Sequence, residues 1–292
     1  MRKEWNERMK TCVSTYSFGR YNGELGICGV IDRAAEMGFD GIEFAEGEWM
    51  NVPPKELEAI GAHAASRGLA RVSLCVAADF ARGDEDEAER EIQRVCTLVD
   101  RAAALGVSMM RHDAASQPRD RKYGIGYDDC LPRVAAAVRR VTAYAAAKGV
   151  RTMTENHGYF SQDANRVEKL INAVAHPNFG ALVDLGNFMC ADEEPTISVG
   201  IMAPYAKHVH AKDFFWKSGM DVDPGEGWFR TRAMNYLRGA IIGQGVAKVY
   251  QSIQILKKSG YDGYITVEFE GMEDNLKGIR VGKDNLTRFI NG

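Results

Sequence analysis

The chain has 292 residues and a formal net charge of −3, with 37 Lys and Arg against 40 Asp and Glu. This length allows one large domain or two small ones, with a substantial hydrophobic core. The near balance of charges supplies no general field that would attract DNA or a phospholipid surface, so we expect neither a nucleic-acid nor a membrane partner. No apolar run is long enough for a membrane span and the opening residues are too polar for a signal peptide, which predicts a soluble cytoplasmic protein.

Amphipathic segments that end in glycine recur along the chain, and each is followed at once by a short apolar or β-branched run. A glycine directly after a helix takes the left-handed conformation that ends the helix, and the chain then enters a strand. Each such segment is therefore a predicted junction between a helix and a strand. The junctions lie in residues 36–44, 66–74, 104–112, 147–155 and 258–270.

Further apolar runs at 12–18, 178–186 and 206–215 bring the number of predicted strands to eight. The segments between them have helical periodicity, as in the apolar positions Ala88, Ile92, Val95, Val99 and Ala102. Strand followed by helix, eight times, predicts an α/β fold: a (βα)₈ TIM barrel forming a single domain over residues 1–292. A doubly wound open sheet is the alternative, but no glycine-rich nucleotide-binding motif follows an early strand.

One long stretch, residues 214–246, has no regular periodicity and is predicted to be a loop that acts as a lid. Its aromatic rings would stack on a sugar and its guanidinium groups would hold an anionic group. Packing within the loop, or a contact between subunits, is the alternative for the same side chains. The residues concerned are Trp216, Trp228, Arg230 and Arg232.

Four successive predicted strands end in residue types that bind metals. Catalytic groups of such a barrel lie at the C-terminal ends of its strands, so these side chains should converge at one rim. Three carboxylates and one imidazole suit Mn²⁺, Mg²⁺ or Co²⁺ better than a metal that prefers thiolates, and zinc remains an alternative. A single carboxylate at a strand end is more often a surface residue or a helix cap, but four in register favour a site. The four positions are Glu155, Asp184, His208 or His210, and Glu268 or Glu270.

The segments ENHG, VDLGNF, VHAKD and VEFEG, in this order and spacing, resemble the xylose-isomerase-like barrels known as sugar phosphate isomerase/epimerases. That superfamily also takes in ketose 3-epimerases, inosose dehydratases and endonuclease IV-type DNA repair enzymes. The likeness covers nearly the whole chain. It implies a divalent metal, with Mn²⁺ as our first choice, held by Glu155, Asp184, His210 and Glu268. His208 and Glu270 share the faces of their neighbours by period-two alternation and remain alternatives.

Three polar residues beside the predicted ligands are candidates for catalysis or substrate binding. His157 would act as a base or touch the substrate, with a loop-capping role as the alternative. Asn187 stands where ketose 3-epimerases carry a substrate-contacting histidine. Lys212 would bind substrate oxygens or an enolate, unless it forms an ion pair with Asp213.

Two further pairs of residues are weaker candidates. Glu43 and His112 end two of the earlier strands and would reach substrate hydroxyls. Gly243 and Gly245 stand before the seventh helix, where many barrels bind phosphate at backbone amides, but two glycines are a weak signal and a plain turn explains them better.

The predicted ligand set suggests a reaction class. A divalent cation that binds adjacent carbonyl and hydroxyl oxygens acidifies the neighbouring C–H and stabilises the enediolate that follows. Glu155 and Glu268, on opposite sides of the ligand, would then exchange protons with carbon as base and acid. We therefore expect a metal-dependent isomerase or epimerase of a small-molecule sugar or keto-sugar.

Other reaction classes remain open at this point. A lyase on the same site, either an inosose-type dehydratase or an enzyme that eliminates from a 3-keto-glycoside, is the first alternative, with His157 as base. An endonuclease IV-like enzyme would need many histidines and a basic face, and a non-catalytic sugar-binding barrel would hold no metal. The sequence leaves the identity of the sugar, its phosphorylation and assembly into a homo-oligomer or with a partner subunit open.

Overall fold

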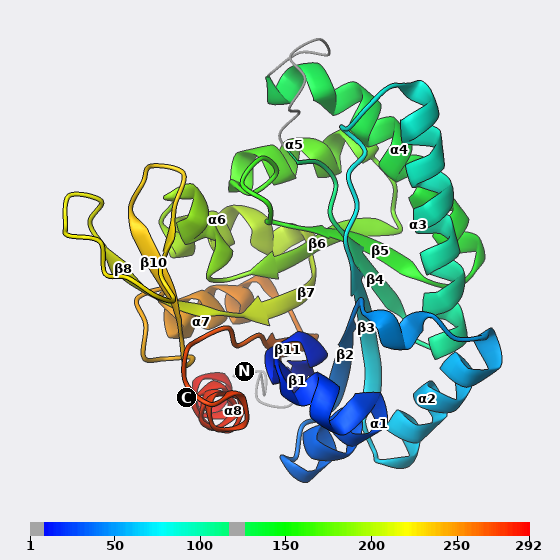
Figure 1. Ribbon diagram of the computed structural model, residues 1–292. Helices are drawn as coiled ribbons and strands as arrows, with labels where there is room; N and C mark the ends of the chain where they lie inside the picture. The colour runs from blue at the N-terminus through cyan, green and yellow to red at the C-terminus, as the bar shows by residue number, and fades with distance from the viewer. Residues whose placement is uncertain (1–8, 117–125) are drawn as a thin grey trace, which may run out of the picture.

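The computed structural model describes residues 9–116 and 126–292 of the chain, and residues 1–8 and 117–125 lie outside the description. Eight parallel strands close into a barrel in the order β1-β11-β7-β6-β5-β4-β3-β2 (Figure 1). These strands are β1 (Lys10–Ser14), β2 (Gly41–Ala45), β3 (Ala70–Val76), β4 (Met109–His112), β5 (Arg151–Glu155), β6 (Phe179–Asp184), β7 (Ala206–Ala211) and β11 (Tyr264–Val267). The predicted (βα)₈ TIM barrel is confirmed.

Each barrel strand is followed along the chain by a helix, and the helices surround the barrel in a single domain (Figure 1). Short 3-10 segments, among them η1 (Thr15–Phe18), η2 (Glu48–Met50) and η4 (Asn187–Ala191), lie between strands and helices near the C-terminal ends of the strands. The helices are α1 (Tyr21–Glu36), α2 (Pro54–Ser66), α3 (Glu85–Leu105), α4 (Tyr127–Ala147), α5 (Ala164–Val174), α6 (Pro195–Met202), α7 (Val249–Ser259) and α8 (Asn275–Asn291).

The glycines at the predicted junctions end the helices as expected. Gly38, Gly68, Gly106, Gly149 and Gly260 all have positive φ angles, between 74° and 88°. This left-handed conformation is accessible to glycine at little cost, so the chain can leave each helix and turn directly into the next strand. The repeated glycine therefore sets the alternation of helix and strand.

Helix α3 illustrates how the sequence specifies one of these helices. Asp84 accepts a hydrogen bond from the backbone N–H of Glu87 at 2.9 Å, and the Glu87 carboxylate accepts one in return from the Asp84 N–H at 3.3 Å. This reciprocal cap satisfies backbone donors that the first turn leaves free. The predicted apolar face of the helix is buried against the barrel, at Ala88, Ile92, Val95, Val99 and Ala102.

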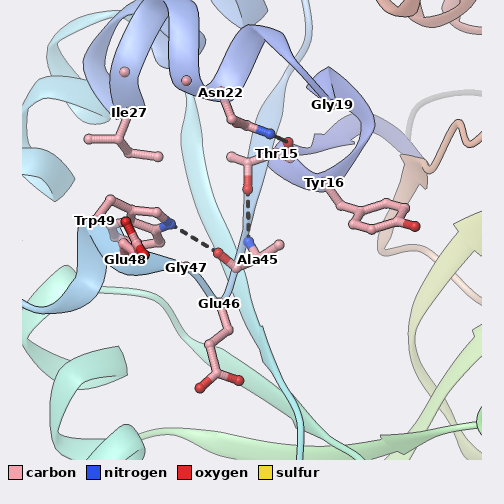
Figure 2. A pocket seen from close by; sticks show the side chains of 12 residues that line it. Thr15, Tyr16, Gly19, Asn22, Ile27, Ala45, Glu46, Gly47, Glu48 and Trp49 are labelled. Atoms are coloured by element: carbon pink, nitrogen blue, oxygen red, sulfur yellow. Dashed lines mark hydrogen bonds between the residues drawn. The ribbon is translucent and has the colours of Figure 1, made fainter.

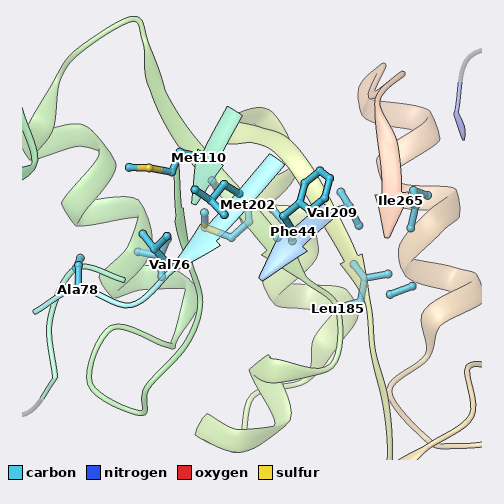
Figure 3. Close-up of a cluster of buried hydrophobic side chains, with 14 of the residues drawn as sticks. Phe44, Val76, Ala78, Met110, Leu185, Met202, Val209 and Ile265 are labelled. Carbon is cyan, nitrogen blue, oxygen red and sulfur yellow. The ribbon is translucent and has the colours of Figure 1, made fainter. Parts of the chain in front are cut away.

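The hydrophobic core lies between the outer face of the barrel and the helices. Figure 3 shows part of it, where Phe44, Met110 and Val209 come from different strands. The inside of the barrel is buried as well, so several strands have no exposed face, as in β6, where every residue is buried. Both faces of a parallel barrel strand are covered, which removes the alternation of polar and apolar residues that would reveal which side chains point inward.

The structure corrects the expectation that residues 214–246 form an irregular loop. Three short strands build an antiparallel sheet there in the order β8-β10-β9, which Figure 1 shows beside α6. None of the three strands is longer than five residues, and such short strands give too weak a pattern to predict the sheet from sequence. The strands are β8 (Asp213–Lys217), β9 (Phe229–Arg230) and β10 (Tyr236–Ala240).

Two further features concern the class of protein. Within residues 9–116 and 126–292, no helix is long and apolar enough to cross a bilayer. All six cysteines are free thiols, in agreement with the absence of any CxxC pair in the sequence.

Candidate metal centre and active site

Four of the predicted metal ligands meet at the C-terminal end of the barrel. Glu155 and Asp184 are the last residues of β5 and β6, His210 lies on β7, and Glu268 directly follows β11. One ligand atom from each residue lies within 4.8 Å of the corresponding atoms of the other three. The parallel register places neighbouring strand ends at the same height, which is why residues so far apart in the sequence converge.

His210 lies at the centre of this cluster. Its Nδ1 is 3.2 Å from Glu268 Oε2, 3.7 Å from Glu155 Oε1 and 3.8 Å from Asp184 Oδ2. Its Nε2 faces the other way and is 2.9 Å from Glu43 Oε1. Burial opposes a charge on the ring, but the surrounding carboxylates raise the pKa of His210 well above its ordinary value.

Glu43 contacts His208 and His210 beneath the pocket. The expectation that it reaches substrate hydroxyls is therefore corrected. The carboxylate is fully buried and is not among the described residues that line the pocket. Its Oε2 accepts a hydrogen bond from Ser73 Oγ at 2.6 Å and lies 3.0 Å from His208 Nε2. Burial opposes its ionisation, but the two histidines hold the pKa of Glu43 well below its usual range.

His208 and His210 share one face of β7, as the period-two alternation predicts, but they occupy different depths. His208 is fully buried, and its Nε2 also lies 2.8 Å from Thr266 Oγ1. His210 is the one whose free ring nitrogen meets the carboxylate cluster. The geometry therefore favours His210 over His208 as the predicted ligand.

The residues present fit a divalent cation. Asp184 Oδ1 accepts hydrogen bonds from the N–H groups of Gly186 at 2.8 Å and Asn187 at 2.9 Å, which leaves Oδ2 turned towards the cluster. Asp184 Oδ2 and His210 Nδ1 are buried and have no hydrogen-bond partner within the part of the chain that the structure describes. Buried polar atoms are normally satisfied, so two such atoms aimed at one point indicate a place for a cation. Three carboxylates and one imidazole suit a hard divalent metal.

Lys212 brings a second positive charge to the same carboxylates. Its Nζ lies 2.8 Å from Glu268 Oε2, 3.4 Å from Asp184 Oδ2 and 3.6 Å from Glu270 Oε2. Burial opposes the charge, but these carboxylates raise the pKa of Lys212 well above its ordinary value. The side chain lines the pocket, where its ammonium can donate to substrate oxygens.

The alternative ion pair between Lys212 and Asp213 does not form. Asp213 instead accepts hydrogen bonds from the N–H groups of Gly243 and Gly245, both at 2.9 Å, and of Ala247 at 3.0 Å. The backbone amides that were a weak candidate for phosphate binding therefore already donate to a carboxylate of the protein itself. This turn is structural, and the phosphate interpretation is wrong.

Arg111 belongs to the site, whereas the neighbouring His112 does not. Arg111 Nη2 lies 2.6 Å from Glu155 Oε2 and 2.8 Å from Asp113 Oδ1, and the guanidinium lines the pocket. The His112 ring is fully buried on the opposite face of β4, between Phe80 and Phe179, and burial lowers its pKa to about 4. A substrate contact by His112 is therefore contradicted, because its side chain faces the helices.

His157 stands at the mouth of the pocket with about half of its side chain exposed. Its Nδ1 is 3.0 Å from Asp113 Oδ1. Partial burial opposes a charged ring, but the Asp113 carboxylate raises the pKa of His157 above its ordinary value. A hydrogen bond to Asp113 leaves Nε2 of the imidazole available for proton transfer.

Asn187 touches a predicted metal ligand and does not face the pocket. Its Nδ2 donates to Glu155 Oε1 at 2.9 Å, its Oδ1 lies 3.3 Å from Lys212 Nζ, and the side chain is buried. It is not among the described residues of the pocket wall, so a direct substrate contact is not supported by its position. It orients Glu155 instead.

The two predicted arginines of the 214–246 segment are engaged elsewhere. Arg232 Nη1 is 3.1 Å from Asp163 Oδ2, and Arg230 stacks on Tyr236 with its guanidinium carbon 3.5 Å from the ring centroid. Neither is among the described residues that line the pocket. Trp216 lines a different depression, and Trp228 packs near Lys217 and Arg238. These side chains hold the small sheet in place, so we assign them no substrate contact.

The pocket over the cluster has a volume of about 360 Å³ and opens at the C-terminal end of the barrel. Its size suits a small ligand such as a monosaccharide. Its described lining residues are Ser14, Tyr16, Ala45, Glu46, Cys75, Val76, Ala77, Arg111, Asp113, Glu155, His157, His210, Lys212, Glu268 and Glu270.

Comparison with known families identifies the barrel. A model of the xylose isomerase-like TIM barrel family matches residues 31–288. The chain belongs to this family. A search of curated protein sequences finds no match to the chain.

Solved structures with the fold of this family cover almost the whole chain. A D-psicose 3-epimerase, solved in the presence of D-fructose, has a TM-score of 0.76 at 14% identity and covers 97% of this chain and 100% of its own. The probable 3-DHS dehydratase AsbF of petrobactin synthesis from Bacillus anthracis has a TM-score of 0.74 at 18% identity, covering 96% and 99%. A xylose isomerase-like TIM barrel protein from Mycobacterium smegmatis, in complex with magnesium, has a TM-score of 0.72 at 17% identity, covering 99% and 98%. At these identities the likeness shows the fold.

Proposed function

We propose that the protein is a divalent-metal-dependent isomerase or epimerase of a sugar or keto-sugar, which moves a proton at the carbon beside a carbonyl through an enediolate. The convergence of Glu155, Asp184, His210 and Glu268 at the C-terminal rim carries this proposal. The presence of sugar 3-epimerases among the structures of the same fold supports it.

Glu155, Asp184, His210 and Glu268 are the residues that would hold the metal. When bound there, a divalent cation supplies Lewis-acid stabilisation of negative charge on substrate oxygens. Mn²⁺ is our first choice, with Mg²⁺, Co²⁺ and Zn²⁺ as alternatives, because carboxylate oxygens outnumber nitrogen in the set. A magnesium complex within the same fold supports a divalent metal.

The side chains around the pocket have different roles in the proposed proton transfer. Glu155 and Glu268 come from strand ends on different parts of the rim, so they can face a bound sugar from two sides as base and acid. Lys212 donates hydrogen bonds to oxygen atoms on which negative charge develops. Arg111, 2.6 Å from Glu155, holds that carboxylate ionised and in one orientation.

A specific observation favours a second candidate, a lyase. His157 lines the pocket, and Asp113 orients its ring, which gives the site a candidate base apart from the predicted metal ligands. Removal of a proton by His157, followed by loss of a β-substituent, would make the enzyme a dehydratase or an eliminating enzyme. A probable dehydratase among the structures of the same fold supports this alternative.

A panel of ketoses, inososes and 3-keto-glycosides tests the proposal. The protein is stripped with chelator, reloaded with Mn²⁺, Mg²⁺, Co²⁺ or Zn²⁺, and assayed by NMR for each compound. We expect metal-dependent conversion of one class to a stereoisomer or isomer of the same mass. An unsaturated product would replace the isomerase with the lyase, and no metal-dependent change in any compound would contradict both.

A further inference from the structure

A second cavity, of about 520 Å³, adjoins the pocket of the candidate metal centre. Tyr16, Ala45 and Glu46 line both cavities, so these residues form the border between the two spaces. We call the second space the Trp49 cavity. We propose that it binds a second ring of the substrate, so that the enzyme acts on a neutral glycoside rather than on a free or phosphorylated monosaccharide. This inference rests on the proposed function and names the substrate class for the same site.

The Trp49 ring gives the cavity a fixed apolar wall. Figure 2 shows Trp49 beside Ile27, with its Nε1 donating to the backbone carbonyl of Ala45, at 3.1 Å. The ring also packs against Phe44, with centroids 5.6 Å apart. An indole that is held by both a hydrogen bond and core packing presents a flat surface at little entropic cost. Such surfaces bind the apolar face of a sugar or an aryl ring.

Helix α1 contributes Asn22 and Ile27 to the lining, but it leaves the cavity open at two glycines. Gly23 and Gly26 line the cavity, and a Cβ atom built on either would meet no other atom within 4 Å. Gly26, with a φ of 65°, also interrupts the helix, so α1 bends at the cavity. The resulting volume lies within the range of cavities that hold small ligands.

The charged residues that line the Trp49 cavity disfavour an anionic group. No Lys or Arg is among its described lining residues, whereas Glu46 and Glu48 are. In the adjoining pocket, the guanidinium of Arg111 and the ammonium of Lys212 are already paired with carboxylates, at 2.6 Å and 2.8 Å. Glu46 is partly engaged, because its Oε2 accepts from the Ala77 N–H at 2.9 Å and its Oε1 lies 3.7 Å from Arg94 Nη1. Glu48 would repel a phosphate, whereas the hydroxyls of a neutral ring can donate to its carboxylate.

The sizes of the two adjoining cavities suggest how the substrate lies across them. The keto-sugar ring occupies the pocket over the metal ligands, and its glycosidic substituent passes Tyr16 and Ala45 into the Trp49 cavity. Figure 2 shows Tyr16 and Glu46 extending from the shared border. A free monosaccharide would leave the Trp49 cavity empty and lose that part of the binding energy.

Calorimetric titration of the metal-loaded protein with two probes, 3-keto-D-glucose and phenyl 3-keto-β-D-glucoside, tests the inference. Gly23→Leu adds a side chain into the cavity while replacing glycine in a helix, which favours the helix. It should weaken binding of the phenyl glycoside by about tenfold or more, because overpacking costs this much, and leave binding of 3-keto-D-glucose within about twofold. Gly200→Leu is the matched control, because Gly200 is an exposed position of helix α6 where a Cβ also meets no atom within 4 Å.

Trp49→Ala should weaken the phenyl glycoside in the same selective way, by about tenfold. The inference is overturned if the wild-type protein binds both probes equally, or if Gly23→Leu weakens both to the same extent while the control does not. If the wild-type protein binds neither probe, the inference fails, whereas the proposed function is decided separately by the wider panel of ketoses and inososes. Tighter binding of 3-keto-D-glucose 6-phosphate than of the phenyl glycoside would also overturn it.

Discussion

Glu43 and His210 form a buried pair in which the carboxylate Oε1 lies 2.9 Å from Nε2 of the imidazole. They come from β2 and β7, which are not neighbours in the barrel. The pair fixes the histidine so that Nδ1 faces Asp184 and Glu268. A carboxylate that accepts the second N–H of a metal-binding histidine sets the tautomer and strengthens the ligand. Glu43 is therefore a positioning residue for the predicted metal centre.

Replacing Glu43 by Gln should lower the affinity for divalent metal by about 10- to 100-fold, because the imidazole loses its anionic partner. Competition with a fluorescent chelator measures this directly. Ser73→Ala is the matched control, since Ser73 Oγ donates to the same carboxylate at 2.6 Å but does not touch His210. An equal effect of both variants would show that the contact with His210 is not what matters.

Purified protein should carry about one divalent metal per chain that chelator removes, because four ligand atoms lie within 4.8 Å of one another in a donor set that suits such a metal. Asp184→Ala should lower both metal occupancy and melting temperature. Elemental analysis together with thermal unfolding, with and without chelator, measures both quantities. Active wild-type protein without metal would contradict the site assignment.

The barrel was predictable from sequence because its signal is repeated. Glycines such as Gly106 end a helix by a local conformational requirement, which does not depend on the rest of the fold. The convergence of Glu155, Asp184 and His210 was also predictable, because parallel strands that end in polar residues must bring them to one rim. Metal binding by these residues stays a prediction.

The direction of single side chains was harder to predict. Both faces of β4 are buried, so the sequence does not show whether Arg111 or His112 points inward. The prediction of His112 as the inward residue was wrong. The sequence carried a weak signal for the inward face. Arg111 and Asp113, two residues apart, share one face and are both polar, whereas His112 shares the other face with apolar Met110. The depth of Glu43 below the pocket depends on packing across the barrel, which sequence spacing does not encode.

Glu268→Gln should abolish turnover, whereas Glu270→Gln should be milder. Glu268 Oε2 lies 3.2 Å from His210 Nδ1, while Glu270 is in contact with Lys212 at 3.6 Å and lies outside the metal cluster. Steady-state kinetics with metal analysis of each variant separates the two roles. The reverse ranking would mean that the assignment after β11 is wrong by two residues.

If His157 is the base, the rate should fall as the pH drops through its pKa, because only the neutral ring accepts a proton. Asp113 raises that pKa, so Asp113→Asn should lower it and move the acidic limb of kcat/KM to lower pH. A pH profile of the variant against wild type measures the shift. An acidic limb that does not move would exclude His157 as the group that sets it.

Turnover in heavy water tests the central claim, that a side chain of this site removes a proton from the carbon beside a carbonyl. The chosen substrate is the compound that the metal-loaded protein converts, and the product is examined by mass spectrometry and proton NMR. We predict deuterium at that carbon in a product with an unchanged carbon skeleton, as an isomerase or epimerase requires. A labelled unsaturated product would instead indicate the lyase. Product formed without any solvent label, as in a hydride shift, would contradict proton transfer by Glu155, Glu268 or His157.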